Sequence, residues 1–200
     1  MVDIFIEGNE KAFLIEVIKS IGKENELSNI DFISTSGYTN LKLNEVKLKE
    51  NNDLGKTNLI IFDADSNQNG GGFANRLAEI NATLVEIGVR AEIFLLPNHH
   101  DDGDYESLLE QCINPTHIAI LSCFERYQEC VAHNNVHIPP FYSLPDRKAK
   151  IYSYISIFRR SNSEKERFKN EHYWGFDNPE YWNMNSYILN SLKVFLNTHI

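Results

Sequence analysis

Hydrophobic positions in the first half of the chain alternate between short apolar runs and longer stretches with helical spacing. The run Asn58–Phe62 is apolar after its first position, which indicates a strand covered on both faces. In Phe73–Gly88 the apolar side chains return every three to four residues, as in an amphipathic helix. The alternation predicts an α/β, Rossmann-like parallel sheet of about four strands flanked by helices. The predicted strands are Val2–Ile6, Ile30–Ser34, Asn58–Phe62 and Ala91–Leu96, and the predicted helices cover 12–21, 39–51 and 73–88.

The pattern changes after Pro97, where strand-like runs give way to a polar loop and then to helical spacing. In Thr116–His133 the apolar residues again fall on one stripe. We therefore expect an α/β domain at residues 1–112 and a helical C-terminal extension at 113–200, packed on the same core. The helices predicted beyond Pro97 are Glu106–Cys112, Thr116–His133, Lys148–Phe158 and Met184–Leu196.

The composition fits a globular protein, since 42% of the 200 residues are hydrophobic. No apolar run reaches the roughly 18 residues of a membrane-spanning helix, and no secretory signal segment is recognisable. We therefore expect a cytoplasmic protein with no membrane partner. The three cysteines have no paired spacing, which favours free thiols over disulfides and disfavours a zinc site.

Charge is distributed unevenly along a chain whose formal net charge is -9. Residues 1–146 hold 10 Lys and Arg against 23 Asp and Glu, whereas residues 147–169 hold 8 Lys and Arg against two Glu. Such asymmetry is typical of a patch that faces phosphates, and it is equally typical of a solvated helix face. The sequence leaves both interpretations open.

Acidic side chains follow three of the predicted strands. Glu7 comes directly after the first strand, Asp63 and Asp65 end the third, and Asp104 and Glu106 follow the fourth. In an open parallel sheet the carboxyl ends of the strands form the ligand crevice, so we expect these carboxylates to converge. Each one alone is equally explained as a helix cap or a loop residue. Carboxylate oxygens are the ligands that Mg²⁺ prefers, so the pattern predicts a magnesium site.

These motifs resemble those of the Toprim family. Ile4–Gly8, an apolar run that ends in Glu-Gly, resembles the first Toprim motif, and Leu59–Asp65, which ends in Asp-Ala-Asp, resembles the second. The segments Ile93–Asn98 and Asp102–Leu109 are similar to stand-alone Toprim-like proteins of bacteria and archaea, which are related to the OLD-family nucleases. The chain departs from the family at Asn9-Glu10, where an Asp is common, and it lacks the large ATPase domain of the fused relatives.

The resemblance implies a Toprim-like fold and a site for Mg²⁺, with Mn²⁺ as an alternative. The implied metal ligands are Asp63, Asp65 and Glu106, and Asp104 is a further candidate ligand.

The same resemblance implies a metal-dependent nuclease, or a related phosphoryl-transfer enzyme, acting on nucleic acid. Glu7 would then be the general acid or base, or a further metal ligand, and Lys148, or with less support Lys150, would face the phosphate. A non-catalytic Toprim-like module working with a separate ATPase is the alternative. A phosphatase-like enzyme is a third hypothesis. It is disfavoured because no Thr that could serve in catalysis follows the Asp-Ala-Asp run closely.

Overall fold

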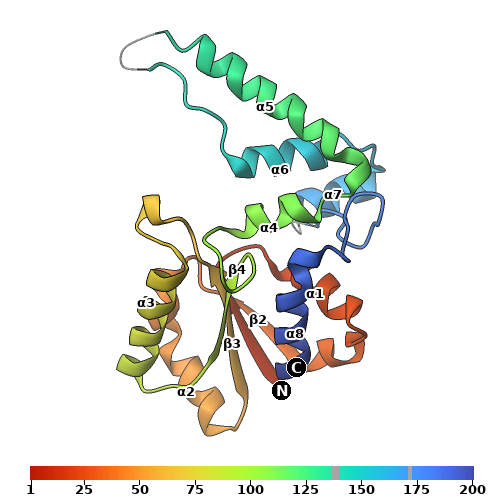
Figure 1. The fold of residues 1–200 in the computed structure, drawn as a ribbon. Helices are drawn as coiled ribbons and strands as arrows, with labels where there is room; N and C mark the ends of the chain where they lie inside the picture. Colours follow the sequence, from red (N-terminus) through yellow and green to blue (C-terminus); the bar gives the residue numbers. More distant parts are fainter. Residues whose placement is uncertain (137–139, 171–172) are drawn as a thin grey trace.

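A four-stranded parallel sheet forms the centre of the computed structural model, which describes residues 1–136, 140–170 and 173–200 (Figure 1). Strand β1 lies between β2 and β3, and β4 pairs with the outer edge of β3. The sheet order is therefore β2-β1-β3-β4. The chain adds β2 on one side of β1, and then adds β3 and β4 on the other side, so the strand order reverses between β1 and β3. The strands are β1 (Val2–Ile6), β2 (Ile30–Ser34), β3 (Thr57–Asp63) and β4 (Glu92–Leu96).

Helices cover both faces of this sheet, which explains why β1 is buried throughout and β3 is buried at all but its two end residues (Figure 1). Ile4 and Ile61 point into one hydrophobic cluster, and Phe5 and Ile60 point into another on the opposite face. The first cluster includes residues of α1, α4, α6 and α8, and the second includes residues of α2 and α3. These helices are α1 (Lys11–Ser20), α2 (Glu45–Asp53), α3 (Phe73–Ile87), α4 (Tyr105–Cys112), α6 (Arg147–Ser156) and α8 (Asn190–His199).

The C-terminal residues join the sheet domain through an aromatic cluster. Trp182 is 1% exposed, packs edge-on against Tyr154 and contacts Phe176, and its indole Nε1 donates to the Trp174 carbonyl at 2.9 Å. Phe176 in turn meets Phe13 of α1, at 5.4 Å between ring centroids. Helix α5 (Ile118–His133) instead projects away from the sheet (Figure 1). A further helix, α7, covers Asn162–Asn170.

The structure confirms the α/β arrangement, its four parallel strands and the helical character of the C-terminal part. No single helix covers 39–51, because that stretch forms a 3-10 segment, Tyr38–Asn44, before α2 begins at Glu45. The apolar stripe predicted for α5 is only partly buried: Phe124 is buried, Ile120 and Val131 are half-buried, and Tyr127 is 55% exposed. Helix α7 was not predicted, because its sequence is strongly polar and has no apolar stripe.

The division of the chain at residue 112 stays a prediction, although Leu108 and Ile151 belong to one hydrophobic cluster. Within the described ranges, no helix combines the length and the apolar character needed to cross a membrane.

Trp182→Ala should lower the free energy of unfolding of the whole chain by about 3–5 kcal/mol, because it empties a fully buried aromatic site. Urea denaturation followed by far-ultraviolet circular dichroism measures this change. Val194→Ala is the matched control: its side chain is 67% exposed on α8, and we expect a change below about 0.5 kcal/mol. A loss below about 1 kcal/mol for Trp182→Ala would contradict a shared core.

Candidate functional site

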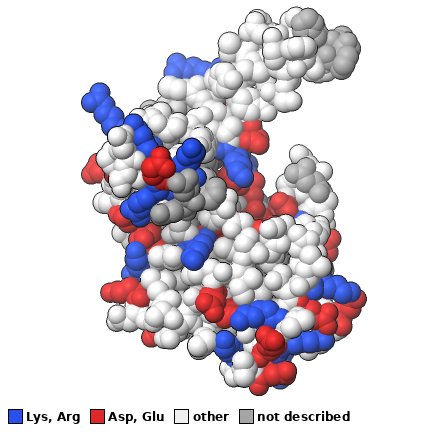
Figure 2. Space-filling view, turned by 180° about the vertical axis from the view of Figure 1, so that it is seen from behind, with Lys and Arg blue, Asp and Glu red and all other residues white. Residues whose placement is uncertain are grey.

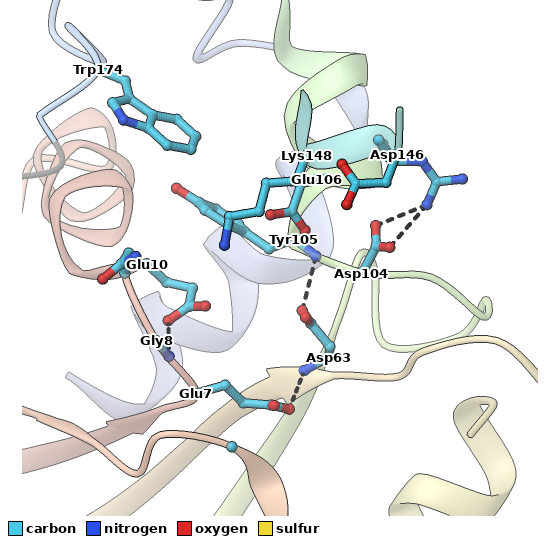
Figure 3. Close-up of a pocket in the computed structure, with 13 residues that line it drawn as sticks. Glu7, Gly8, Glu10, Asp63, Asp104, Tyr105, Glu106, Asp146, Lys148 and Trp174 are labelled. Carbon is cyan, nitrogen blue, oxygen red and sulfur yellow. Dashed lines mark hydrogen bonds and ion pairs between the residues drawn. The ribbon is translucent and has the colours of Figure 1, made fainter. Parts of the chain in front are cut away.

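A cavity of about 420 Å³ lies at the carboxyl ends of β1 and β3, where the direction of strand addition reverses. Ligands of open α/β sheets bind at this kind of position. Side chains from the β1 end, the β3 end, the start of α4 and the start of α6 border the cavity (Figure 3). Those used below are Glu7, Glu10, Asp63, Asp104, Tyr105, Glu106, Arg147, Lys148 and Trp174.

Two hydrogen bonds from backbone amides connect the acidic residues at the floor of the cavity (Figure 3). The amide of Asp63 donates to Glu7 Oε1 at 3.0 Å, and the amide of Tyr105 donates to Asp63 Oδ1 at 2.9 Å. Tyr105 is the first residue of α4, so the positive end of that helix faces the Asp63 carboxylate. The strand ends and the helix start therefore hold Glu7 and Asp63 side by side.

Asp104 already has partners in the structure. Its carboxylate accepts a hydrogen bond from the Ser107 amide at 2.8 Å and so caps α4. It also pairs with Arg147 of α6, with Nη1 at 2.9 and 3.0 Å from the two oxygens. Asp104 would have to exchange these contacts in order to bind a metal ion.

Glu10 is a buried cavity residue that the sequence did not single out. It is 6% exposed, and its Oε2 accepts a hydrogen bond from the Gly8 amide at 2.8 Å. Its position just after the Glu-Gly turn, three residues beyond Glu7, was the available signal. Sequence comparison with the Toprim motif marked this segment only as a departure.

Burial and mutual repulsion raise the pKa values of the cavity carboxyl groups. Burial, assisted by the charge of Asp65, raises the pKa of Glu7 to about 7, although the Asp63 amide opposes the shift. Burial and the neighbouring Glu7 raise the pKa of Asp63 well above its ordinary value. Burial likewise raises the pKa of Glu10 and Glu106, while the charge of Lys148 partly opposes both shifts. The cavity therefore carries more negative charge than its own cations compensate.

The structure distinguishes the two candidate lysines. Lys148 lines the cavity and extends toward Glu106 and Tyr105 (Figure 3). Lys150 is instead engaged at the α4–α5–α6 packing, 3.0 Å from Glu125 and 3.6 Å from Glu110. Of the two lysines, only Lys148 lines the cavity.

Asp65 does not line the cavity, although it lies close enough to act on the pKa of Glu7. Its carboxylate pairs with Arg76 of α3, with Nη2 at 2.6 Å from Oδ2. The structure thus brings five predicted residues to one cavity and directs Asp65 and Lys150 to other partners. Those five are Glu7, Asp63, Asp104, Glu106 and Lys148.

The donor chemistry of the cavity fits a hard divalent cation, because its carboxylates supply oxygen ligands and uncompensated charge. In the described part of the chain, however, no three His, Cys, Asp or Glu side chains are arranged to hold a metal ion. Cation binding therefore requires rotation of the carboxylate side chains from the positions in the structure. Asp63, Glu106 and Glu7 are the groups whose raised pKa values a cation would reverse.

Several residues of types that often bind metal ions or stack on bases have structural roles here. The His99 ring stacks on Phe94 and its Nδ1 accepts a hydrogen bond from the Leu95 amide, so His99 is part of the packing around β4. Cys112 is a buried free thiol. Trp182 is enclosed by the aromatic cluster and is not available to stack a base.

A family model described as a protein of unknown function matches residues 2–198 of the chain. No curated protein and no solved structure matches it. The match covers the sheet and the C-terminal helices together.

The unfolding free energy should fall as the pH rises from 5 to 8 without divalent ions. Folding raises the pKa of Glu7 from 4.5 to about 7, so between these values the folded chain holds a proton that the unfolded chain has released. Glu7→Gln removes this contribution and should reduce the fall by about 2–3 kcal/mol, at ~1.4 kcal/mol for each pKa unit. Urea denaturation at both pH values in EDTA measures it.

Glu180→Gln serves as the control, since Glu180 is exposed and does not line the cavity. An equal fall in the unfolding free energy of wild type and of Glu7→Gln would contradict a raised pKa of Glu7 in the folded chain.

Proposed function

The chain belongs to the family described as DUF3226, a family of proteins of unknown function. We propose that this member is a metal-dependent phosphodiesterase acting on nucleic acid. One observation carries the proposal: carboxylates from β1, β3 and α4 meet Lys148 in one cavity at the switch point of the sheet. The acidic side chains of the cavity outnumber its basic ones, Arg147 and Lys148. A divalent cation would neutralise part of this excess negative charge, and the cation and Lys148 would then bind a phosphate together.

The positions of the motif residues support a Toprim-like site. Glu7 follows β1 and Asp63 ends β3, and these strands are neighbours in the sheet. The hydrogen bond between the Asp63 amide and Glu7 shows that the two motifs meet in space. Glu106, in the first turn of α4, faces the same cavity.

Asp63 and Glu106 would hold the cation, and Asp104 would join them on releasing Arg147. A bound Mg²⁺ would supply Lewis-acid polarisation of the phosphate oxygens. Glu7, which lines the same cavity, would accept the proton of the attacking water. Lys148 would offer a point charge to the phosphate.

The basic segment 147–169 extends from this cavity. Arg147 and Lys148, at the start of α6, border the carboxylates, and α7 carries further basic residues. Lys and Arg side chains gather at the height of α7 in the left part of Figure 2. A nucleic-acid backbone approaching this side would meet positive charge before reaching the acidic cavity. This arrangement supports nucleic acid over a small phosphate ester as the substrate.

A non-catalytic Toprim-like module that works with a separate ATPase is the second candidate. Its supporting observation is the ion pair that holds Asp104 on Arg147, together with the lack of three converged ligands among the described side chains. In such a module the cavity would bind a phosphate or a cation without cleavage.

Asp63→Asn should abolish Mg²⁺- or Mn²⁺-dependent cleavage of plasmid and single-stranded DNA, a loss of at least about 100-fold, because it removes the central carboxylate. Gel electrophoresis of labelled substrates measures the loss. Asp53→Asn, at the end of α2, is the matched control and should retain full activity. DNA binding without cleavage under either metal would favour the non-catalytic module.

Lys148→Met should lower kcat for cleavage by about 10- to 100-fold, because the phosphate loses its neighbouring cation. Lys150→Met should keep kcat within about threefold, since Lys150 contacts Glu110 and Glu125 instead. Single-turnover cleavage rates at saturating metal separate the two variants. The reverse order of effects would assign the phosphate contact to Lys150.

A further inference from the structure

Asp65 belongs to the Asp-Ala-Asp run, yet it is paired with a cation of the protein itself. We infer that the Arg76 guanidinium takes the place of a second metal ion beside Asp65, so that the centre on Asp63 binds a single divalent cation. This inference rests on the proposed function, because it concerns how many cations that centre holds. Its evidence is the geometry of Asp65 and the burial of Arg76.

The backbone around Asp65 fixes the direction of its side chain. Asp65 has a φ of +59°, a left-handed conformation that a non-glycine residue seldom adopts. Its amide donates to the Gly103 carbonyl at 2.6 Å, and its carbonyl accepts from the Gly103 amide at 2.8 Å. A Cβ atom at Gly71 would lie 2.5 Å from the Asp65 Cβ, so the glycine loop closes tightly on this residue. These contacts hold Asp65 outside the cavity and toward α3.

Arg76 is equally fixed. Its side chain is 3% exposed, its guanidinium carbon lies 3.1 Å from the centroid of the Tyr38 ring, and its Nη1 contacts Glu79 at 2.7 Å. Its Nε has no hydrogen-bond partner in the structure. A guanidinium keeps its charge at all ordinary pH values, and burying that charge is costly unless carboxylates stay beside it. The pairing with Asp65 is therefore a permanent part of the fold.

Arg76 is held by Asp65, which follows Asp63 by two residues, and the charges of both Asp65 and Arg76 act on the pKa of Glu7. Two-metal sites hold their ions about 3.5–4 Å apart and need carboxylates free to bind both. Here the Asp65 carboxylate is occupied, and the guanidinium repels a second divalent ion at that point. Asp63 and Glu106, the two cavity carboxylates assigned to the cation, suffice for one Mg²⁺ ion with its waters.

Mn²⁺ binding to the whole protein, counted by equilibrium dialysis with electron paramagnetic resonance, tests the inference without any measurement of activity. We expect one Mn²⁺ per chain in wild type, and at least a tenfold weaker affinity in Asp63→Asn. Asp65→Asn should still bind one ion with an affinity within about threefold of wild type. Asp53→Asn is the control for the loss of a carboxylate elsewhere.

The double variant Asp65→Asn with Arg76→Gln guards against misfolding, because it removes the buried guanidinium together with its Asp65 partner. It too should bind one ion. Two ions in wild type, or a tenfold loss of affinity in the double variant, would overturn the inference and leave the proposed function intact. A wild-type protein that binds no Mn²⁺ would overturn the proposed function and the inference with it.

Discussion

The candidate site depends on the short hydrogen-bonded path from Glu7 through Asp63 to the first amide of α4. The path joins two neighbouring strand ends to a helix that begins 42 residues after Asp63 in the chain. Because each carboxylate accepts a backbone amide, its position is set by the sheet and by the helix start. The sheet and the helix start therefore place the Glu7 and Asp63 carboxyl groups side by side despite their mutual repulsion.

Sequence analysis could predict that the acidic residues of this path lie close together. Continuous apolar runs located β1 and β3, and the acids that follow them had to lie at one edge of a parallel sheet. The partner of Asp65 was not within reach, since it depends on a left-handed backbone and on a buried Arg76 eleven residues later. Helical spacing predicts that Arg76 lies on α3 but carries no information on whether it is solvated or buried.

The C-terminal part shows a similar division. Helical spacing of apolar residues identified helices, and the family resemblance favoured Lys148 over Lys150. The contacts of Lys150 with Glu110 and Glu125 could not be predicted, because they depend on how α6 packs against α4 and α5. The stripe on α5 misled for a physical reason. An apolar helical face is buried only if another element covers it, and in the described residues α5 meets little beyond α6 and its own 3-10 entry turn.

The two tryptophans of the chain differ in a way that has practical value. Trp174 borders the cavity beside Tyr105, whereas Trp182 is enclosed in the aromatic cluster, one ring away from it. The indole emission of the chain therefore combines one chromophore at the rim of the site with one internal reference. A ligand in the cavity would meet Trp174, which lines it, and would not meet Trp182, so intrinsic fluorescence offers a label-free readout of ligand screening.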